Sequence, residues 1–206
     1  MRWTWTGRLS PKQAIARTTI HRAQAAASTC EEALQKVSRT AELDRLTGLP
    51  SRSVLLDRLV SAIAHARRDG TRVALLFLDL DNFKTINDTL GHAAGDEALR
   101  ITADCLRASV REVDTVSRHG GDEFLILLSE ITHVDDAVLV ADKVIAALDA
   151  STLAGGHALS LTASVGISVY PDHGEDPDGL IGRADSAMYA AKRQGQTSSV
   201  FSHDES

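Results

Sequence analysis

A Gly-Gly-Asp-Glu segment at residues 120–123 is the strongest chemical signal in this sequence. The apolar run over 124–128 that follows it predicts a buried strand. Two glycines directly before a strand indicate a tight hairpin turn, in which the backbone can approach a ligand closely. Two adjacent carboxylates in a partly buried turn are unfavourable unless a cation shares their charge. The segment therefore predicts a metal-assisted site for an anionic, phosphate-bearing ligand.

A second pair of acids, Asp79 and Asp81, lies at the end of an apolar run over residues 73–80. This run also predicts a buried strand, and carboxylates at a strand end suit Mg²⁺ or Mn²⁺ when substrate phosphates complete the coordination shell. A solvated strand end is the alternative interpretation. An EF-hand loop is excluded because Lys84 stands where that loop requires glycine. No Gly-Lys-Ser/Thr of a Walker-A loop occurs, so metal, lysines and loop amides would hold the phosphates.

The composition limits the class of protein. The chain has 206 residues, of which 43% are hydrophobic and 24% charged, which suits one well-packed domain with an additional segment. Its formal net charge of −6 argues against a DNA-binding protein but permits a nucleotide ligand. Cys30 and Cys105 are too few for a disulfide framework, and we expect reduced thiols. No apolar run approaches the roughly 18 residues of a membrane span, so we expect a soluble, cytoplasmic protein.

The elements that must position these acids alternate along the chain. Residues 11–46 predict one long polar helix that either pairs as a coiled-coil stalk or packs on the domain. Beyond a break at 46–50, the patterns predict helices over 53–68, 95–110, 134–150 and 178–194, and strands over 73–80, 115–118, 123–128 and 159–170. This order predicts an α/β or α+β sandwich with a mixed sheet. We expect a helical linker over 1–43, the main domain over 44–198 and a flexible tail over 199–206.

Several ordered motifs over residues 44–196 resemble the GGDEF domain of the diguanylate cyclase family. They are D-x-L-T-G-L-P at 44–50, D-L-D-x-F-K-x-I-N-D at 79–88, G-H-x-x-G-D at 91–96, G-G-D-E-F at 120–124, S-V-G-I at 164–167 and A-D-x-A-M-Y-x-A-K at 184–192. The resemblance implies a fold like that of the nucleotidyl cyclases and the polymerase palm. In that fold a five-stranded, mixed but mainly antiparallel sheet is flanked by helices, and a helical stalk precedes it.

The resemblance further implies that the protein condenses two GTP into cyclic di-GMP with release of pyrophosphate. Metal binding would fall to Asp79, the Leu80 carbonyl, Asp122 and Glu123, catalysis to Asp122 and Glu123, and substrate binding to Phe83, Lys84, Asn87, His92, Asp96, Gly120, Gly121 and Lys192. The metal would be Mg²⁺ or Mn²⁺. Within this set, Asn87 and Asp96 would read the guanine edge, because a carboxylate accepts from guanine N1–H and N2–H₂. As alternatives, Asn87 and Asp96 could be helix caps and Gly95 only a turn former.

Arg111 and Asp114 match the family's R-x-x-D site for the inhibitory product in type and in their offset from Gly120. An arginine can fork onto a phosphate or a guanine edge. The alternative is a surface ion pair. Two departures from the family pattern stand out: Ser51 replaces a usual asparagine, and Gln196 replaces an arginine that faces phosphate, so we expect weaker triphosphate binding.

Three functions remain open at this stage. The first is an active cyclase that works as a two-fold homodimer, since one guanine site per domain and a symmetric product require two facing domains. The second is a catalytically weak or silent domain that binds GTP or cyclic di-GMP as a receptor. The third is a cyclase with relaxed base choice. The intact acids favour the first over the second, and Asn87 with Asp96 favours it over the third.

Overall fold

The computed structural model describes residues 42–151 and 161–201. The expected stalk over 1–43 lies almost wholly outside this part of the chain. Residues 42–46, which we expected inside the long helix, instead form a bend and a turn in which Leu43 pairs with Pro50. The reason is local: the Asp44 carboxylate accepts hydrogen bonds from the Thr47 amide at 2.8 Å and the Thr47 hydroxyl at 2.7 Å. Such an Asp-centred turn competes with the helix.

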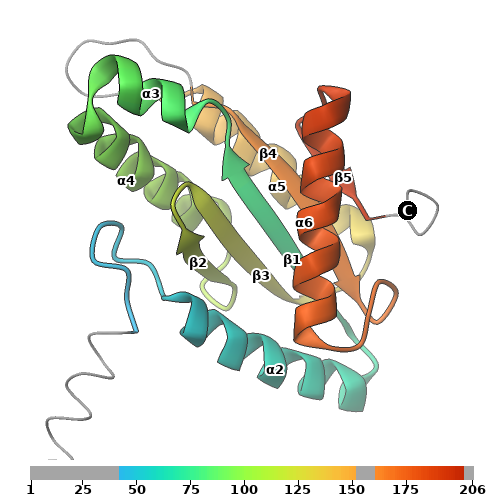
Figure 1. The fold of residues 1–206 in the computed structure, drawn as a ribbon. Coiled ribbons are helices and arrows are strands. Elements are labelled where there is room, and N and C mark those ends of the chain that lie inside the picture. Colours follow the sequence, from blue (N-terminus) through green and yellow to red (C-terminus); the bar gives the residue numbers. More distant parts are fainter. Residues whose placement is uncertain (1–41, 152–160, 202–206) are drawn as a thin grey trace, which may run out of the picture. The chain divides into compact units, whose positions relative to one another are not determined.

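Within the described residues, ten elements follow this turn (Figure 1). They are α2 (Arg52–Asp69), β1 (Arg72–Leu80), α3 (Phe83–Leu90), α4 (His92–Ser109), β2 (Thr115–Gly120), β3 (Glu123–Ile131), α5 (Val134–Asp149), β4 (Ala163–Tyr170), α6 (Pro177–Gln194) and β5 (Ser198–Val200). No helix in the described ranges is long and apolar enough to cross a bilayer.

The strands form one five-stranded sheet in the order β2-β3-β1-β4-β5. β1 is antiparallel to β3 and to β4, β2 and β3 form a hairpin, and β5 runs parallel to β4. The predicted mixed, mainly antiparallel sheet is confirmed. The tail expected from residue 199 starts too early, because Ser199 and Val200 pair with Gly166 and Ile167. Gly195 ends α6 in the left-handed conformation and so turns the chain back along β4.

Alternation along β1 divides the core between the two faces of the sheet. Leu76 and Leu78 pack with the cluster beneath α4 and α5, whereas Leu75 and Phe77 pack with the cluster beneath α2 and α6. Successive side chains of a strand point to opposite faces, so a strand covered on both faces is apolar throughout. Figure 1 shows the helices on the two sides of the sheet.

Gly166 on β4 sets how closely α6 approaches the sheet. A Cβ at this position would lie 2.0 Å from the Ala184 carbonyl oxygen and 2.1 Å from the Met188 amide nitrogen. Only glycine permits this separation. The S-V-G-I motif and the A-D-x-A-M-Y motif are thus two sides of one strand–helix contact.

The short helix α3 and the strand β5 were not predicted. α3 has only eight residues and one buried side chain, Ile86, so it is too short for an apolar repeat to be recognised in the sequence. α4 begins at His92 rather than at 95, because Gly91, at φ 85°, separates it from α3. β4 begins at Ala163, and residues 159–160 of its predicted range lie outside the described part.

Candidate active site

The pairing of β1 with β3 brings the acidic residues of both motifs to one end of the sheet. Asp79 lies opposite Glu123, and the Leu80 amide donates to the Asp122 carbonyl oxygen at 3.3 Å. Gly121, at φ 54°, makes the turn between β2 and β3, while Gly120 is the last residue of β2. Asp79 and Glu123 are in phase with the β1 and β3 residues that pack under α6.

The acids of this cluster disfavour one another's ionised forms. Burial raises the pKa of Asp79, and the neighbouring Asp122 and Asp81 raise it further, while Lys192 opposes the shift. Burial also raises the pKa of Glu123, and Asp79 and Asp122 add to this effect. Like charges held together in this way favour a shared cation.

The donor set fits a hard divalent cation held jointly with a ligand. In the part of the chain that the structure describes, no three His, Cys, Asp or Glu side chains form a complete metal cage. The carboxylates of this cluster therefore need further oxygens, which main-chain carbonyls and substrate phosphates can supply, as is usual for Mg²⁺.

Lys192 contacts the cluster directly. Its ammonium nitrogen lies 2.5 Å from Asp79 Oδ1, and the two side chains are 32% and 17% exposed. We expected this lysine to meet phosphate; in the structure it is paired with a predicted metal ligand. Nearby, the Ser164 hydroxyl donates to Asp81 Oδ1 at 2.9 Å. Ser164 belongs to the S-V-G-I motif, and no local spacing reveals this contact across 83 residues.

The predicted guanine residues lie on α3 and α4. Asn87 is inside α3, and Asp96 is in the first half of α4, whose N-cap is Gly91, so neither is a cap. A Cβ on Gly95 would lie 2.1 Å from Asn87 Oδ1. Gly95 is therefore more than a turn former, because the absence of a side chain leaves room for the Asn87 amide. Asp96 is about half exposed and 3.9 Å from Arg100, so its carboxylate is accessible.

The remaining predicted substrate residues begin the same two helices. Phe83 is the first residue of α3, and its partly buried ring packs on the core. Lys84 and His92 are exposed. At the C-terminal end of α6, Gln196 is exposed, and the Arg193 guanidinium lies 5.8 Å from the centre of the Tyr189 ring. Arg193 therefore lies against Tyr189 and does not take the place of the arginine that Gln196 replaces.

Arg118 fixes the acidic turn to the start of the domain, and its role was missed in the sequence. It donates to the Gly121 carbonyl from Nε at 3.0 Å and from Nη2 at 2.6 Å, and from Nη1 to Asp44 at 3.3 Å. Burial would raise the pKa of Asp44, but hydrogen bonds from Thr47 and the Arg118 charge lower it below its usual value. Asp44 opens the D-x-L-T-G-L-P motif and Arg118 lies just before G-G-D-E-F, but their separation of 74 positions hides the contact.

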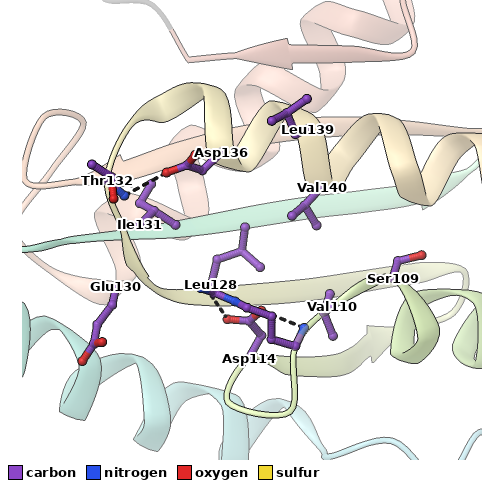
Figure 2. Close-up of a pocket in the computed structure, with 11 residues that line it drawn as sticks. Ser109, Val110, Asp114, Leu128, Glu130, Ile131, Thr132, Asp136, Leu139 and Val140 are labelled. Atoms are coloured by element: carbon purple, nitrogen blue, oxygen red, sulfur yellow. Dashed lines mark hydrogen bonds and ion pairs between the residues drawn. The ribbon is translucent and has the colours of Figure 1, made fainter.

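Arg111 and Asp114 form a tight, unequally exposed pair. Two nitrogens of the guanidinium donate to the Asp114 carboxylate at 3.1 Å, and Nη2 also donates to the Ser129 carbonyl at 2.9 Å. The Asp114 side chain is 1% exposed, whereas that of Arg111 is 59% exposed. Both line a cavity of about 390 Å³ (Figure 2), together with Glu130, Asp136 and apolar side chains of α5.

Comparison with known proteins gives one consistent family. The model of the family "Diguanylate cyclase, GGDEF domain" matches residues 41–198. The diguanylate cyclase TpbB of Pseudomonas aeruginosa is 43% identical over 163 residues, which cover 79% of this chain and 38% of TpbB. The chain thus spans about two fifths of that relative. The cyclic di-GMP phosphodiesterase NbdA of the same organism is 34% identical over 83% of this chain and 22% of its own.

Solved structures agree with the fold. The GGDEF domain of TpbB matches with a TM-score of 0.75 and 42% identity, covering 78% of this chain and 94% of that one. The coiled coil and GGDEF domain of DgcB from Caulobacter crescentus, in complex with c-di-GMP, matches with a TM-score of 0.73 and 27% identity. The match covers 90% of this chain and 98% of that one. With its sheet order, its acidic turn and these matches, the chain belongs to the GGDEF family of diguanylate cyclase domains.

Proposed function

We propose that this domain is an active diguanylate cyclase that condenses two GTP into cyclic di-GMP and pyrophosphate. The observation that carries the proposal is the β1–β3 register, which sets Asp79 opposite Glu123 beside Asp122 at one end of the sheet. A silent structural domain would have no use for carboxylates that raise one another's pKa.

Asp79, Asp122, the Leu80 carbonyl and Glu123 would hold Mg²⁺ or Mn²⁺. When bound, such an ion stabilises the negative charge that develops on the transferred phosphoryl group and favours ionisation of the attacking hydroxyl. Glu123 has a second possible role: its raised pKa suits it to accept the proton of the 3′-hydroxyl. In this proposal, substrate phosphates meet the Gly120–Gly121 backbone, Phe83, Lys84 and Lys192.

Asn87 and Asp96 would select guanine. The exposed Asp96 carboxylate can accept from guanine N1–H and N2–H₂, while the Asn87 amide both donates and accepts. Adenine would present an acceptor to Asp96 and leave it unpaired, at a cost of about 1–3 kcal/mol. His92, at the start of α4, would lie at the base or ribose. Two domains, each with one GTP, would face each other in a homodimer, and we expect them to work in the cytoplasm.

The decisive test incubates the full chain with GTP and Mg²⁺ and separates the nucleotides. We expect cyclic di-GMP and pyrophosphate, no cyclic product from ATP, and loss of product in Asp122→Asn. An Asp122→Asn variant as active as wild type would refute the proposed metal site, and a mixed product from GTP with ATP would support relaxed base choice.

We further propose that cyclic di-GMP inhibits by binding at Arg111 and Asp114. Two guanidinium nitrogens already contact Asp114, which is buried, so a ligand would first meet the exposed side of Arg111. We expect the double variant Arg111→Ala, Asp114→Ala to lose cyclic di-GMP binding in calorimetry while GTP still binds. Unchanged product binding in a folded double variant would exclude this site.

The receptor function is the second candidate, and Gln196 is the observation that favours it. The exposed glutamine supplies no positive charge at the end of α6, and relatives such as NbdA carry phosphodiesterase names. A folded chain that binds cyclic di-GMP but forms none from GTP would support the receptor over the enzyme.

A further inference from the structure

The contact between Lys192 and Asp79 bears on whether a metal ion can bind without the nucleotide. The ammonium group lies 2.5 Å from Asp79 Oδ1, and neither side chain is more than a third exposed. Asp79 also lies within electrostatic reach of Asp122 and Asp81. Lys192 therefore supplies the positive charge that balances this cluster in the structure.

The position of Lys192 is built into the fold. Gly166 lets α6 lie directly against β4, and Lys192 is in the last turn of that helix, two residues before its end at Gln194. Asp79 is in register with Ser164 on β4 and in phase with the β1 residues beneath α6. The helix thus aims the lysine at the carboxylate, and the contact is not a chance encounter of two surface side chains.

We infer that Lys192 acts as an internal counter-ion that competes with divalent cations for Asp79. A cation that binds Asp79 must displace the ammonium group, which then needs another anion. The triphosphate supplies that anion, because a displaced lysine on α6 remains beside the same cluster. Metal and triphosphate therefore bind together, and the metal alone binds weakly. The identity of the triphosphate rests on the proposed function; the competition for Asp79 rests on the ion pair alone.

The size of the effect follows from what a nearby opposite charge does to a carboxylate. A cation this close lowers the proton affinity of a carboxylate by about one to three orders of magnitude. Removal of the ammonium should therefore strengthen the binding of Mn²⁺ to nucleotide-free protein by about tenfold or more.

The experiment measures Mn²⁺ affinity of the full chain by calorimetry in the absence of nucleotide. Lys192→Met should bind Mn²⁺ at least about tenfold more tightly than wild type. Arg193→Met, one position along on the same helix turn, removes the same charge and should leave the affinity unchanged. The double variant Asp79→Asn, Lys192→Met should lose the gain, since the site itself is then incomplete.

Three outcomes would overturn the inference: equal Mn²⁺ affinity in Lys192→Met and wild type, an equal gain in Arg193→Met, or a gain that survives Asp79→Asn. Lys192→Gln serves as a second neutral variant if the methionine variant does not fold. A chain that makes no cyclic di-GMP but shows the Mn²⁺ contrast would refute the proposed enzyme and leave the counter-ion in place.

Discussion

Gly95 has no side chain to offer a ligand, yet at the residue scale it bears directly on the proposed guanine site. A Cβ there would lie 2.1 Å from Asn87 Oδ1 and 2.9 Å from Cγ, so Gly95→Ala must push the amide aside. We expect GTP affinity to fall by about tenfold, because a hydrogen bond to the base is lost. Stability should not fall, since alanine is up to about 1 kcal/mol better than glycine inside a helix.

The matched control is Gly182→Ala on α6, where a Cβ would meet no atom within 4 Å. Calorimetry with GTP and thermal unfolding of both variants make the comparison. Equal GTP affinity in Gly95→Ala and Gly182→Ala would mean that Asn87 does not contact the base.

Glu123 gives a pH-dependent prediction of stability. Burial, Asp79 and Asp122 hold its pKa above the usual value in the folded state, so ionised Glu123 weakens the metal-free fold. Protonated Glu123 therefore contributes stability that is fully present below the ordinary glutamate pKa and is lost as the pH rises through the raised pKa. Glu123→Gln should therefore have a Tm a few degrees above that of wild type at neutral pH, with the difference vanishing near the ordinary pKa.

Thermal unfolding at several pH values checks this sign. Glu112→Gln, which neutralises an exposed acid before β2, is the control and should not gain stability as the pH rises. Saturating Mn²⁺ should reduce the advantage of Glu123→Gln, because the cation then offsets the repulsion. A constant difference across the pH range would contradict the electrostatic explanation.

The sequence anticipates the residues of the site better than their contacts. Asp79, Asp122 and Glu123 could be predicted to share one end of a sheet, because both acid pairs adjoin predicted strands and the family resemblance assigns them to one site. The pairs Lys192–Asp79 and Arg118–Asp44 span 113 and 74 positions. No local pattern carries such contacts, since they depend on how α6 and the first turn of the domain pack.

At the scale of elements, the separation between α6 and β4 is the most sensitive feature. Gly166→Ala would place a Cβ 2.0 Å from the Ala184 carbonyl oxygen, and backbone cannot yield as a side chain does. The helix must move away, at a cost of about 2–3 kcal/mol in unfolding free energy. Lys192 would move with it and lose its position over Asp79. Urea denaturation measures the cost, and Gly182→Ala on the same helix should leave stability intact.

Long helices with a regular apolar face could be predicted, whereas α3 and β5 could not. The helices now described as α2 and α5 have regular apolar faces, and the predicted ranges are within one residue of the observed bounds at each end. α3 and β5, of eight and three residues, are too short for such a repeat to be recognised. Their positions follow from tertiary packing: α3 continues from β1 at the acidic end of the sheet, and β5 adds a parallel strand after the Gly195 turn.

At the scale of the whole molecule, the proposed guanine-reading pair, Asn87 and Asp96, would hold one base per domain, while cyclic di-GMP contains two guanines related by two-fold symmetry. Two copies must therefore face each other for each turnover. We expect the rate of pyrophosphate release per domain to rise with the concentration of the full chain and to level off where dimers predominate, as followed by mass photometry. GTP binding per domain should not change on dilution, since both residues of the proposed base site belong to one copy. A rate per domain that stays constant where the protein is monomeric would mean that one domain can close the ring alone.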